Sequence, residues 1–364
     1  MASLFDKLTI GEIQLNNRII LAPMTRSRAD DEGIQTEIVA DYYVQRASGG
    51  LLITEAVNIS PMAKAYVRTP GIYTAEQISA WNKIADAVHA AGGKIFMQIF
   101  HTGRIALPDL LPNNAQPVSA SAVKAAGQNY TDAGMKDFVE PRELSLNEIN
   151  ATVADFANAA RNAIDAGFDG VELHGASGYL VQQFLMKSVN LRTDEYGGSV
   201  ENRTRFLFEV LDAMSAAIGS ERVGVKFSPQ MPFNDISEPD ADEVYSYIMK
   251  NLSGRKLAYV HVGDHANIGW HEKLRPLYEG AYFAGANFDK KRGAEYVAAG
   301  KADAIVYGTK FLANPDLPER FRKDAALNEA DTSTFYSGGA KGYTDYPTID
   351  RSANAEARVK CREM

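Results

Sequence analysis

Residues 168–179 carry the side chains best suited to chemistry. A short apolar run, residues 171–173, is followed at once by His174, Ser177 and Tyr179, which are set among glycines. An imidazole, a hydroxyl and a phenol can donate hydrogen bonds to a small molecule, and the imidazole and the phenol can also transfer a proton. A glycine-rich turn that holds a buried structural histidine fits the same residues, so this segment by itself leaves both interpretations open.

Two polar residues interrupt apolar runs elsewhere in the chain. Gln98 lies within Ile95–Phe100, and Lys226 lies within residues 222–227. A buried ammonium group is costly unless an anion or a polar ligand pairs with it. A buried amide needs partners as well, and its donor and acceptor suit the edge of a heteroaromatic ring. Both residues therefore indicate a polar ligand in the interior of the fold.

The elements that must position these residues alternate between short apolar runs and helical patterns. Eight runs are predicted to be buried strands, at residues 17–24, 50–54, 94–99, 171–173, 222–227, 257–262, 281–284 and 302–307. Helical periodicity is found at residues 36–47, 75–91, 146–166, 202–218, 241–252, 289–299 and 317–323. Residues 4–15 are predicted to form an N-terminal hairpin around Gly11.

The pattern of the runs predicts an α/β fold. Their apolar residues are continuous rather than alternating, which indicates strands buried on both faces, as in parallel sheets. Eight such strands with intervening helices indicate a single (β/α)8 TIM barrel. A doubly wound open sheet is the alternative, but it would usually carry a glycine fingerprint after its first strand, where residues 22–26 read Ala-Pro-Met-Thr-Arg. We predict one domain over residues 1–350, with a long loop insertion at 102–145 after the third strand and a flexible tail over 351–364.

In such a barrel, the functional site is built from residues at the carboxyl ends of the strands. The predicted strand ends present a set of candidates, namely Pro23, Met24, Thr25, Ala56, Gln98, Phe100, His101, His174, Ser177, Tyr179, Lys226, Gly285, Ala286, Gly308 and Thr309. The glycine-bearing turns after the seventh and eighth strands have backbone N–H groups that suit a phosphate, although they could equally serve only to turn the chain.

The composition narrows the class of protein. The formal net charge of the 364 residues is −8, which disfavours a nucleic-acid partner. The single cysteine, Cys361, excludes a disulfide within the chain, and the scattered histidines show no metal-ligand spacing, so no metal is expected. The first residues lack a signal-peptide pattern, and no apolar run reaches membrane-spanning length. We therefore expect a cytoplasmic protein, monomeric or homodimeric, without a membrane partner.

Taken together, the motifs resemble the old yellow enzyme family of FMN-dependent ene-reductases, of the NADH:flavin oxidoreductase type. The likeness runs from about residue 4 to residue 347 and is carried by residues 17–19, 22–26, 98–104, 166–171, 179–180, 192–199, 314–317 and 342–347. The resemblance implies a barrel with FMN at its carboxyl mouth and NADPH or NADH as the hydride donor. It also implies a small-molecule substrate, an α,β-unsaturated carbonyl or nitro compound whose activated C=C bond is reduced.

The resemblance also assigns roles to individual residues. It implies that FMN is bound by Pro23, Met24, Thr25, Ala56, Gln98, His174, Lys226, Gly285, Ala286, Gly308 and Thr309. His174 with Ser177 would bind the oxygen of the substrate, and Tyr179 would donate a proton to its α-carbon. The substrate side would be lined by Tyr66, Phe100, His174, Ser177, Asn234 and Tyr343.

Four positions depart from the pattern of the family. Ser177 replaces the usual Asn or second His, Lys226 replaces a more frequent Arg, and Phe100 stands where Trp is often found. Thr309 occupies the position of a basic residue that commonly binds the FMN phosphate, although Lys310 follows it. A shorter hydroxyl and a displaced cation would weaken the substrate and phosphate sites. The alternative function is therefore a flavin-binding protein with weak or no ene-reductase activity, whereas a flavin-dependent isomerase is disfavoured by the retained proton donor.

Overall fold

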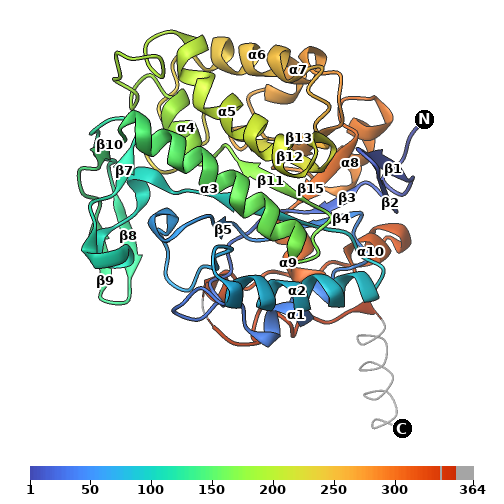
Figure 1. The fold of residues 1–364 in the computed structure, drawn as a ribbon. Coiled ribbons are helices and arrows are strands. Elements are labelled where there is room, and N and C mark those ends of the chain that lie inside the picture. Colours follow the sequence, from blue (N-terminus) through green and yellow to red (C-terminus); the bar gives the residue numbers. More distant parts are fainter. Residues whose placement is uncertain (337, 350–364) are drawn as a thin grey trace, which may run out of the picture.

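The computed structural model describes residues 1–336 and 338–349, and its centre is a closed barrel of parallel strands (Figure 1). In this part of the chain eight strands form the barrel: β3 (Ile19–Leu21), β4 (Leu51–Ile53), β6 (Ile95–Phe100), β11 (Gly170–His174), β12 (Val223–Phe227), β13 (Tyr259–Gly263), β14 (Tyr282–Gly285) and β15 (Ala304–Tyr307). Each pairs in parallel with the next, and β15 pairs with β3, which closes the ring. The barrel prediction is confirmed and the open sheet is wrong. The predicted tail over residues 351–364 lies outside the described residues.

An apolar cluster fills the interior of the barrel near the amino ends of the strands. It contains inward-facing strand residues such as Ile20, Phe96 and Phe283, all fully buried. The predicted N-terminal hairpin is present as β1 (Leu8–Ile10) and β2 (Ile13–Leu15), and it adds Ile10 and Leu15 to the same cluster. The hairpin therefore covers this end of the barrel, and the opposite end is left for polar side chains.

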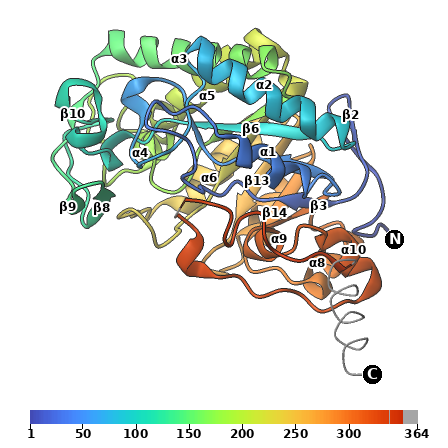
Figure 2. The same cartoon turned by 90° about the horizontal axis from the view of Figure 1, so that it is seen from below.

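Helices cover the outside of the strands, as the helical patterns predict. They are α1 (Glu37–Val44), α2 (Ala75–Ala90), α3 (Leu146–Asp165), α5 (Val200–Ile218), α6 (Ala241–Leu252), α8 (Lys290–Ala298) and α10 (Leu317–Lys323). Figure 2 shows α3 beside α2 and α5 on one flank, which agrees with their mutual contacts. The prediction missed α4 (Leu180–Leu185), α7 (Trp270–Leu274) and α9 (Thr309–Ala313), because five or six residues are too few to show a helical period. None of the described helices is both long and apolar enough to cross a membrane.

The insertion predicted as a loop at residues 102–145 contains short strands. Its elements are β7 (Val118–Ser119) paired with β10 (Arg142–Glu143), and the hairpin β8 (Gln128–Thr131) with β9 (Gly134–Asp137). Another short strand, β5 (Val57–Asn58), pairs in parallel with the last two residues of β6, beyond those that pair with β4. The hairpin is attached by Asn129, whose buried Nδ2 donates to the carbonyls of Ala65 at 2.6 Å and Ile105 at 3.2 Å. These contacts hold the insertion close to the carboxyl end of β6.

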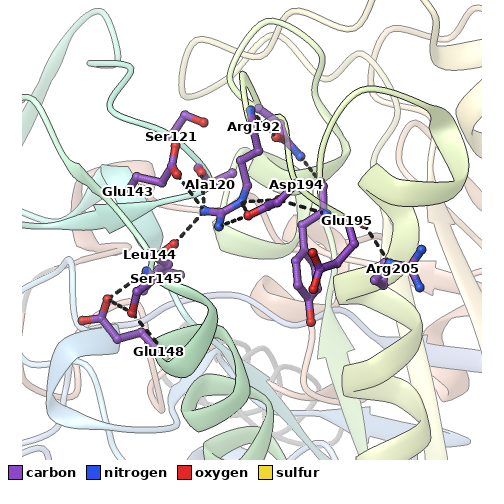
Figure 3. A network of polar contacts seen from close by, with 12 residues as sticks. Ala120, Ser121, Glu143, Leu144, Ser145, Glu148, Arg192, Asp194, Glu195 and Arg205 are labelled. Atoms are coloured by element: carbon purple, nitrogen blue, oxygen red, sulfur yellow. Dashed lines mark hydrogen bonds and ion pairs between the residues drawn. The ribbon is translucent and has the colours of Figure 1, made fainter.

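Arg192, in the loop that follows α4, forms hydrogen bonds with the insertion (Figure 3). Its guanidinium group donates to the carbonyls of Ala120 at 3.1 Å and Leu144 at 2.6 Å, and its Nη2 lies 2.6 Å from a carboxylate oxygen of Asp194. Glu143 approaches the same guanidinium group at 3.4 Å. The motif at residues 192–199 therefore has a structural role, since it bridges two segments far apart in the sequence.

Candidate active site

A cavity of about 390 Å³ opens at the carboxyl ends of β3 and of β12 to β15. Seven of the predicted cofactor residues line it, namely Pro23, Met24, Lys226, Gly285, Ala286, Gly308 and Thr309. Its volume lies within the range of small-molecule and cofactor sites. The prediction that strand ends assemble one site is therefore matched by residues that are almost three hundred positions apart in the sequence.

The turns after β14 and β15 form one end of this cavity. Ala286 and Asn287 have positive φ angles, 69° and 57°, a left-handed conformation that is strained for alanine and better tolerated by asparagine. A Cβ added to Gly285 would lie 2.7 Å from Nε2 of His261, so only glycine fits there without displacing the ring. Backbone N–H groups in such turns can bind an anion. This end of the cavity therefore fits the phosphate of a nucleotide cofactor.

Two side chains at the start of α9 adjoin the phosphate end. Thr309 and Lys310 both line the cavity and both are exposed. Within residues 1–336 and 338–349, the ammonium group of Lys310 has no carboxylate within ion-pair distance. Lys310 is therefore available to replace the basic residue that the family resemblance expects at position 309.

A polar layer separates the apolar interior of the barrel from the cavity. Nε2 of Gln98 donates to Oε1 of Glu172 at 2.6 Å, and Oε2 of Glu172 lies 3.1 Å from Nδ1 of His261. Lys226 lines the cavity and forms no ion pair among the described residues. Burial lowers the pKa of Lys226, and the charge of Glu172 opposes that shift. The layer therefore presents the cation of Lys226 to the cavity, and Glu172 holds the amide of Gln98 within the same layer.

The predicted substrate-side residues meet around Tyr179. Its hydroxyl lies 2.9 Å from the hydroxyl of Tyr66, and its ring makes edge-to-face contacts with Phe100 and His174, at 5.3 Å and 4.9 Å between ring centroids. Asn234 also reaches the two phenols. Burial raises the pKa of Tyr179 well above its usual value, and the neighbouring Tyr66 adds to this shift. Tyr179 therefore keeps its proton at neutral pH and can act as a donor.

His174 is held as a neutral ring in a single tautomer. Burial lowers its pKa well below the usual value, and the positive charge of Lys226 contributes to this shift. Its Nδ1 accepts the backbone N–H of Ala176 at 3.3 Å, so the ring proton resides on Nε2. His174 can therefore donate a hydrogen bond from Nε2 to an oxygen atom of a ligand.

Ser177 occupies a left-handed backbone position and its hydroxyl has a local partner. Its φ angle is 58°, its N–H donates to Oγ of Ser228 at 3.0 Å, and its carbonyl accepts from Asn234 at 2.9 Å. Its Oγ lies 3.8 Å from Sδ of Met231. The backbone of Ser177 thus shapes the turn, and the weak contact with sulfur leaves His174 as the stronger donor.

Three strand-end residues complete the predicted set. Thr25 is half-buried, and its hydroxyl makes no hydrogen bond to any residue that the structure describes. Ala56 packs in the apolar cluster that contains Tyr179. His101 is buried and its Nδ1 accepts the N–H of Gly103 at 3.1 Å. Thr25 is therefore free to meet a ligand, whereas His101 stabilises its own turn.

Tyr343, which was predicted to line the substrate side, is packed in the core of the protein. Its fully buried ring stacks on Tyr42 at 4.3 Å, and the guanidinium carbon of Arg28 lies 4.2 Å from its centroid. Tyr336, which sequence reasoning missed, is 66% exposed and close enough to contribute to the raised pKa of both Tyr66 and Tyr179. The structure thus brings Tyr336 to the mouth of the site.

Sequence reasoning also missed Glu172, His261 and His265. His261 and His265 line the cavity, and Glu172 lies directly beneath it in contact with Gln98. The sequence did contain a signal for Glu172. A carboxylate within an apolar strand is as unusual as the ammonium group of Lys226, and it indicates a polar role in the interior. The two histidines gave no comparable signal, since they are scattered along the chain.

These features fit a phosphate-bearing heteroaromatic cofactor. The glycine turns suit its phosphate, and the unpaired cation of Lys226 and the amide of Gln98 suit a ring that gains negative charge. Tyr179, a proton donor, contacts His174, a hydrogen-bond donor, and His174 pairs in register with Lys226 of the cavity lining. The fold and site thus define a flavin-dependent oxidoreductase built on a (β/α)8 barrel.

The comparison with protein families agrees with this class. The model of the NADH:flavin oxidoreductase / NADH oxidase family matches residues 3–328. The chain therefore belongs to this family, which confirms the resemblance to the old yellow enzymes.

Known relatives are similar over almost their full length. The chain is 45% identical over 353 residues to 12-oxophytodienoate reductase 1 of Oryza sativa subsp. japonica, with 94% of this chain and 92% of that protein covered. It is 46% identical over 349 residues to a probable flavin mononucleotide-dependent alkene reductase of Leishmania infantum, with 93% and 96% covered. The solved structure of morphinone reductase in complex with tetrahydroNAD has a TM-score of 0.93 at 42% identity, with 97% of this chain and 99% of that chain covered.

Proposed function

We propose that this protein is an FMN-dependent ene-reductase that uses NADPH or NADH to reduce the activated C=C bond of α,β-unsaturated carbonyl or nitro compounds. The proposal is carried by the contact between Tyr179, which keeps its proton, and the neutral ring of His174. Their ring centroids are 4.9 Å apart, and a cavity that fits a flavin lies nearby. The relative described as an FMN-dependent alkene reductase and the neighbour solved with tetrahydroNAD support it.

The residues that would hold FMN divide between its ring and its phosphate. Gln98, Lys226 and Thr25 would contact the ring, and the turns at Gly285 and Gly308 would bind the phosphate. When bound, FMN supplies the hydride-transfer chemistry that no side chain of this site can provide. Lys226 would stabilise negative charge in the cavity, because its ammonium group has no carboxylate partner within the described part of the chain.

The chain itself orients the substrate and moves the proton. Nε2 of His174 donates to the carbonyl or nitro oxygen, which draws electron density away from the C=C bond. Tyr179 holds a proton on its phenol oxygen and donates it to the α-carbon. Phe100 packs beside the ring of His174, with 6.0 Å between the ring centroids, and gives this side of the site an apolar surface.

A second candidate function is a flavin-binding protein with weak ene-reductase activity. It is favoured by the contact of the Ser177 hydroxyl with Sδ of Met231, which leaves the oxygen-binding site with one strong donor. Retention of Tyr179 with a hydrogen-bonded phenol favours the reductase, because a flavin-binding protein has no use for a proton donor. Turnover of an activated alkene by the purified protein distinguishes the two.

Replacement of Ser177 by asparagine is expected to raise kcat/KM for an unsaturated ketone about tenfold, through a second amide donor at the oxygen site. Asparagine also tolerates the left-handed φ of 58° better than serine does. Steady-state kinetics with 2-cyclohexenone provide the measurement. Ser177→Ala is the matched control and should leave kcat/KM about unchanged, and a tenfold loss in the alanine variant would show that the hydroxyl already binds the substrate.

Replacement of Lys310 by alanine is expected to weaken FMN binding roughly tenfold, because a charged hydrogen bond to phosphate is lost. Titration of the apoprotein with FMN, followed by quenching of flavin fluorescence, measures the change. Lys291→Ala is the control, since Lys291 is an exposed lysine of α8 that does not line the cavity. Equal dissociation constants for wild type and Lys310→Ala would assign phosphate binding to the turns alone.

The proposed function is tested by the colour of the protein and by its turnover. The purified protein is expected to be yellow, to lose its flavin absorbance when NADPH is added without oxygen, and to regain it when 2-cyclohexenone follows. A colourless protein that FMN cannot reconstitute would overturn the proposal. Comparison of NADPH with NADH in the first step assigns the hydride donor.

We also infer a cytoplasmic protein that acts as a monomer or homodimer, with residues 1–350 as a single domain. The continuous barrel of the described residues supports the single domain. Size-exclusion chromatography with light scattering measures the oligomeric state. A tetramer or larger assembly would contradict it.

A further inference from the structure

Glu172 is a buried carboxylate at the centre of the barrel. Its exposed fraction is 0%, and it lies between Val171 and Leu173, whose side chains face the outer helices. Glu172 therefore faces inward, in the polar layer above the apolar cluster that contains Phe96 and Tyr259. A buried carboxylate is costly, so its position calls for a role that an apolar residue could not fill.

Both oxygens of this carboxylate have side-chain partners, and one of these partners, His261, lines the cavity. Oε1 accepts from Nε2 of Gln98 at 2.6 Å, a short bond that fixes the orientation of the amide. The other end of that amide, Oε1 of Gln98, has no hydrogen-bond partner among the described residues and is left to accept from a ligand. If Glu172 were apolar, the amide could rotate and present its donor instead.

The second oxygen controls the tautomer of His261. Oε2 of Glu172 lies 3.1 Å from Nδ1 of His261, and burial lowers the pKa of this histidine, against the effect of Glu172. A neutral His261 that donates from Nδ1 carries its lone pair on Nε2. This Nε2 points towards Gly285 at the cavity wall, where an added Cβ would lie only 2.7 Å away.

Glu172 also compensates the positive charge of Lys226. The two residues lie on adjacent strands, with Glu172 opposite Gly224 and Lys226 opposite His174 in the register. They are not within ion-pair distance, so the ammonium group stays available to a ligand, but the charge of Glu172 still acts on it. In a buried layer such an interaction is screened less than in water.

We propose that Glu172 is a positioning residue that fixes the amide of Gln98 and the tautomer of His261, and that its charge lowers the reduction potential of the bound flavin. The inference rests on the proposed function, because it requires that a flavin occupies the cavity. A reduced flavin carries extra negative charge, and a nearby carboxylate disfavours it. Glu172 therefore opposes the effect of Lys226 and keeps the cofactor a better hydride donor.

The test is the Glu172→Gln variant, which keeps the length of the side chain and removes its charge. Its two-electron potential with FMN bound is expected to rise by at least about 30 mV, which corresponds to a tenfold change in the equilibrium constant. Its FMN dissociation constant is expected to rise by roughly two- to tenfold, because the new amide competes for the orientation of Gln98. Dye-equilibrated reduction and fluorescence titration measure the two quantities.

Glu238→Gln is the matched control. Glu238 is a buried carboxylate that accepts from Gln182 at 2.9 Å and from Tyr245 at 2.8 Å, away from the cavity lining. Its replacement is expected to lower the thermal stability without moving the potential. An equal shift in both variants would assign the effect to general loosening of the barrel and overturn the inference.

Other outcomes are equally decisive. A folded Glu172→Gln protein whose potential stays within about 10 mV of wild type, a factor of about two in the equilibrium constant, would overturn the inference. If that variant does not fold, Glu172→Asp decides the positioning role, because the shorter carboxylate keeps the charge and gives up the 2.6 Å bond to Gln98. Unchanged FMN affinity in Glu172→Asp would reject this role. A wild-type protein that binds no flavin would instead overturn the proposed function, and the inference with it.

Discussion

Replacement of His174 by alanine is expected to lower kcat/KM for 2-cyclohexenone about 10²–10³-fold, the usual cost of one well-aimed donor at a developing oxyanion. The effect is large because Nε2–H of His174 is the strong donor on the substrate side, while the Ser177 hydroxyl contacts Met231. The measurement is the rate at which the alkene reoxidises prereduced enzyme, normalised to bound FMN. The step driven by NADPH should change much less, since it does not use the substrate carbonyl.

His89→Ala serves as the control for loss of a histidine. His89 lies on α2, outside the barrel, where its Nε2 lies 2.8 Å from a carboxylate oxygen of Asp169. Its removal should reduce stability and leave the rate per bound FMN unaltered. A His174→Ala enzyme that keeps the wild-type rate with the alkene would transfer the oxygen-binding role to other groups, with backbone N–H groups of the turn as the first to examine.

Replacement of Tyr179 by phenylalanine is expected to slow reduction of the alkene about 10²–10⁴-fold, the range that a positioned general acid contributes. The hydroxyl of Tyr179 lies 2.9 Å from that of Tyr66, and its ring contacts Phe100 and His174. These contacts fix the position of the phenol from which the proton is donated. Rapid mixing of prereduced enzyme with 2-cyclohexenone measures this step alone. Reduction of the bound FMN by NADPH should proceed at the wild-type rate.

Tyr66→Phe is the matched control, because it removes the neighbouring hydroxyl and keeps the proton donor. We expect a much smaller loss than for Tyr179→Phe. If both variants lose the same activity, the proton comes from the pair or from water rather than from Tyr179 alone.

The pH profile provides a further check on these assignments. Burial raises the pKa of Tyr179 well above its usual value and lowers that of His174 well below its usual value. Tyr179 therefore stays protonated and His174 stays neutral. Titration of these two groups should not change the rate of alkene reduction between about pH 7 and pH 9. A clear loss of rate across this interval that vanishes in Tyr179→Phe would contradict the raised pKa of the phenol.

The strand pattern carried most of the information about the fold. Continuous apolar runs such as those at β6 and β12 can be buried only if both faces of the strand are covered, and helices between them supply that cover. A ring of eight parallel strands satisfies this requirement and places every carboxyl end at one mouth. Candidates as distant as Met24 and Thr309 could therefore be grouped in advance, and both line the cavity.

The segments beyond the strands were harder to predict. Tyr343 and Tyr336 lie in the same irregular stretch after α10, and no period indicates which of them approaches Tyr66. Tyr343 is held in the core by stacking on Tyr42 and by Arg28, whereas Tyr336 reaches the mouth of the site. Which tyrosine reaches the site depends on contacts between segments that are far apart in the sequence. Local sequence patterns do not predict such contacts.

The sequence alone determined the barrel, the family and the residues that could do the chemistry, because burial on both strand faces and polar residues inside apolar strands leave local signals. Tertiary structure decided how these residues act. It turned the amide of Gln98 towards Glu172, directed the hydroxyl of Ser177 to Met231, and left Lys226 without an ion pair among the described residues. Hydrogen bonds and burial set protonation and orientation, and both depend on neighbours that only the folded chain brings together.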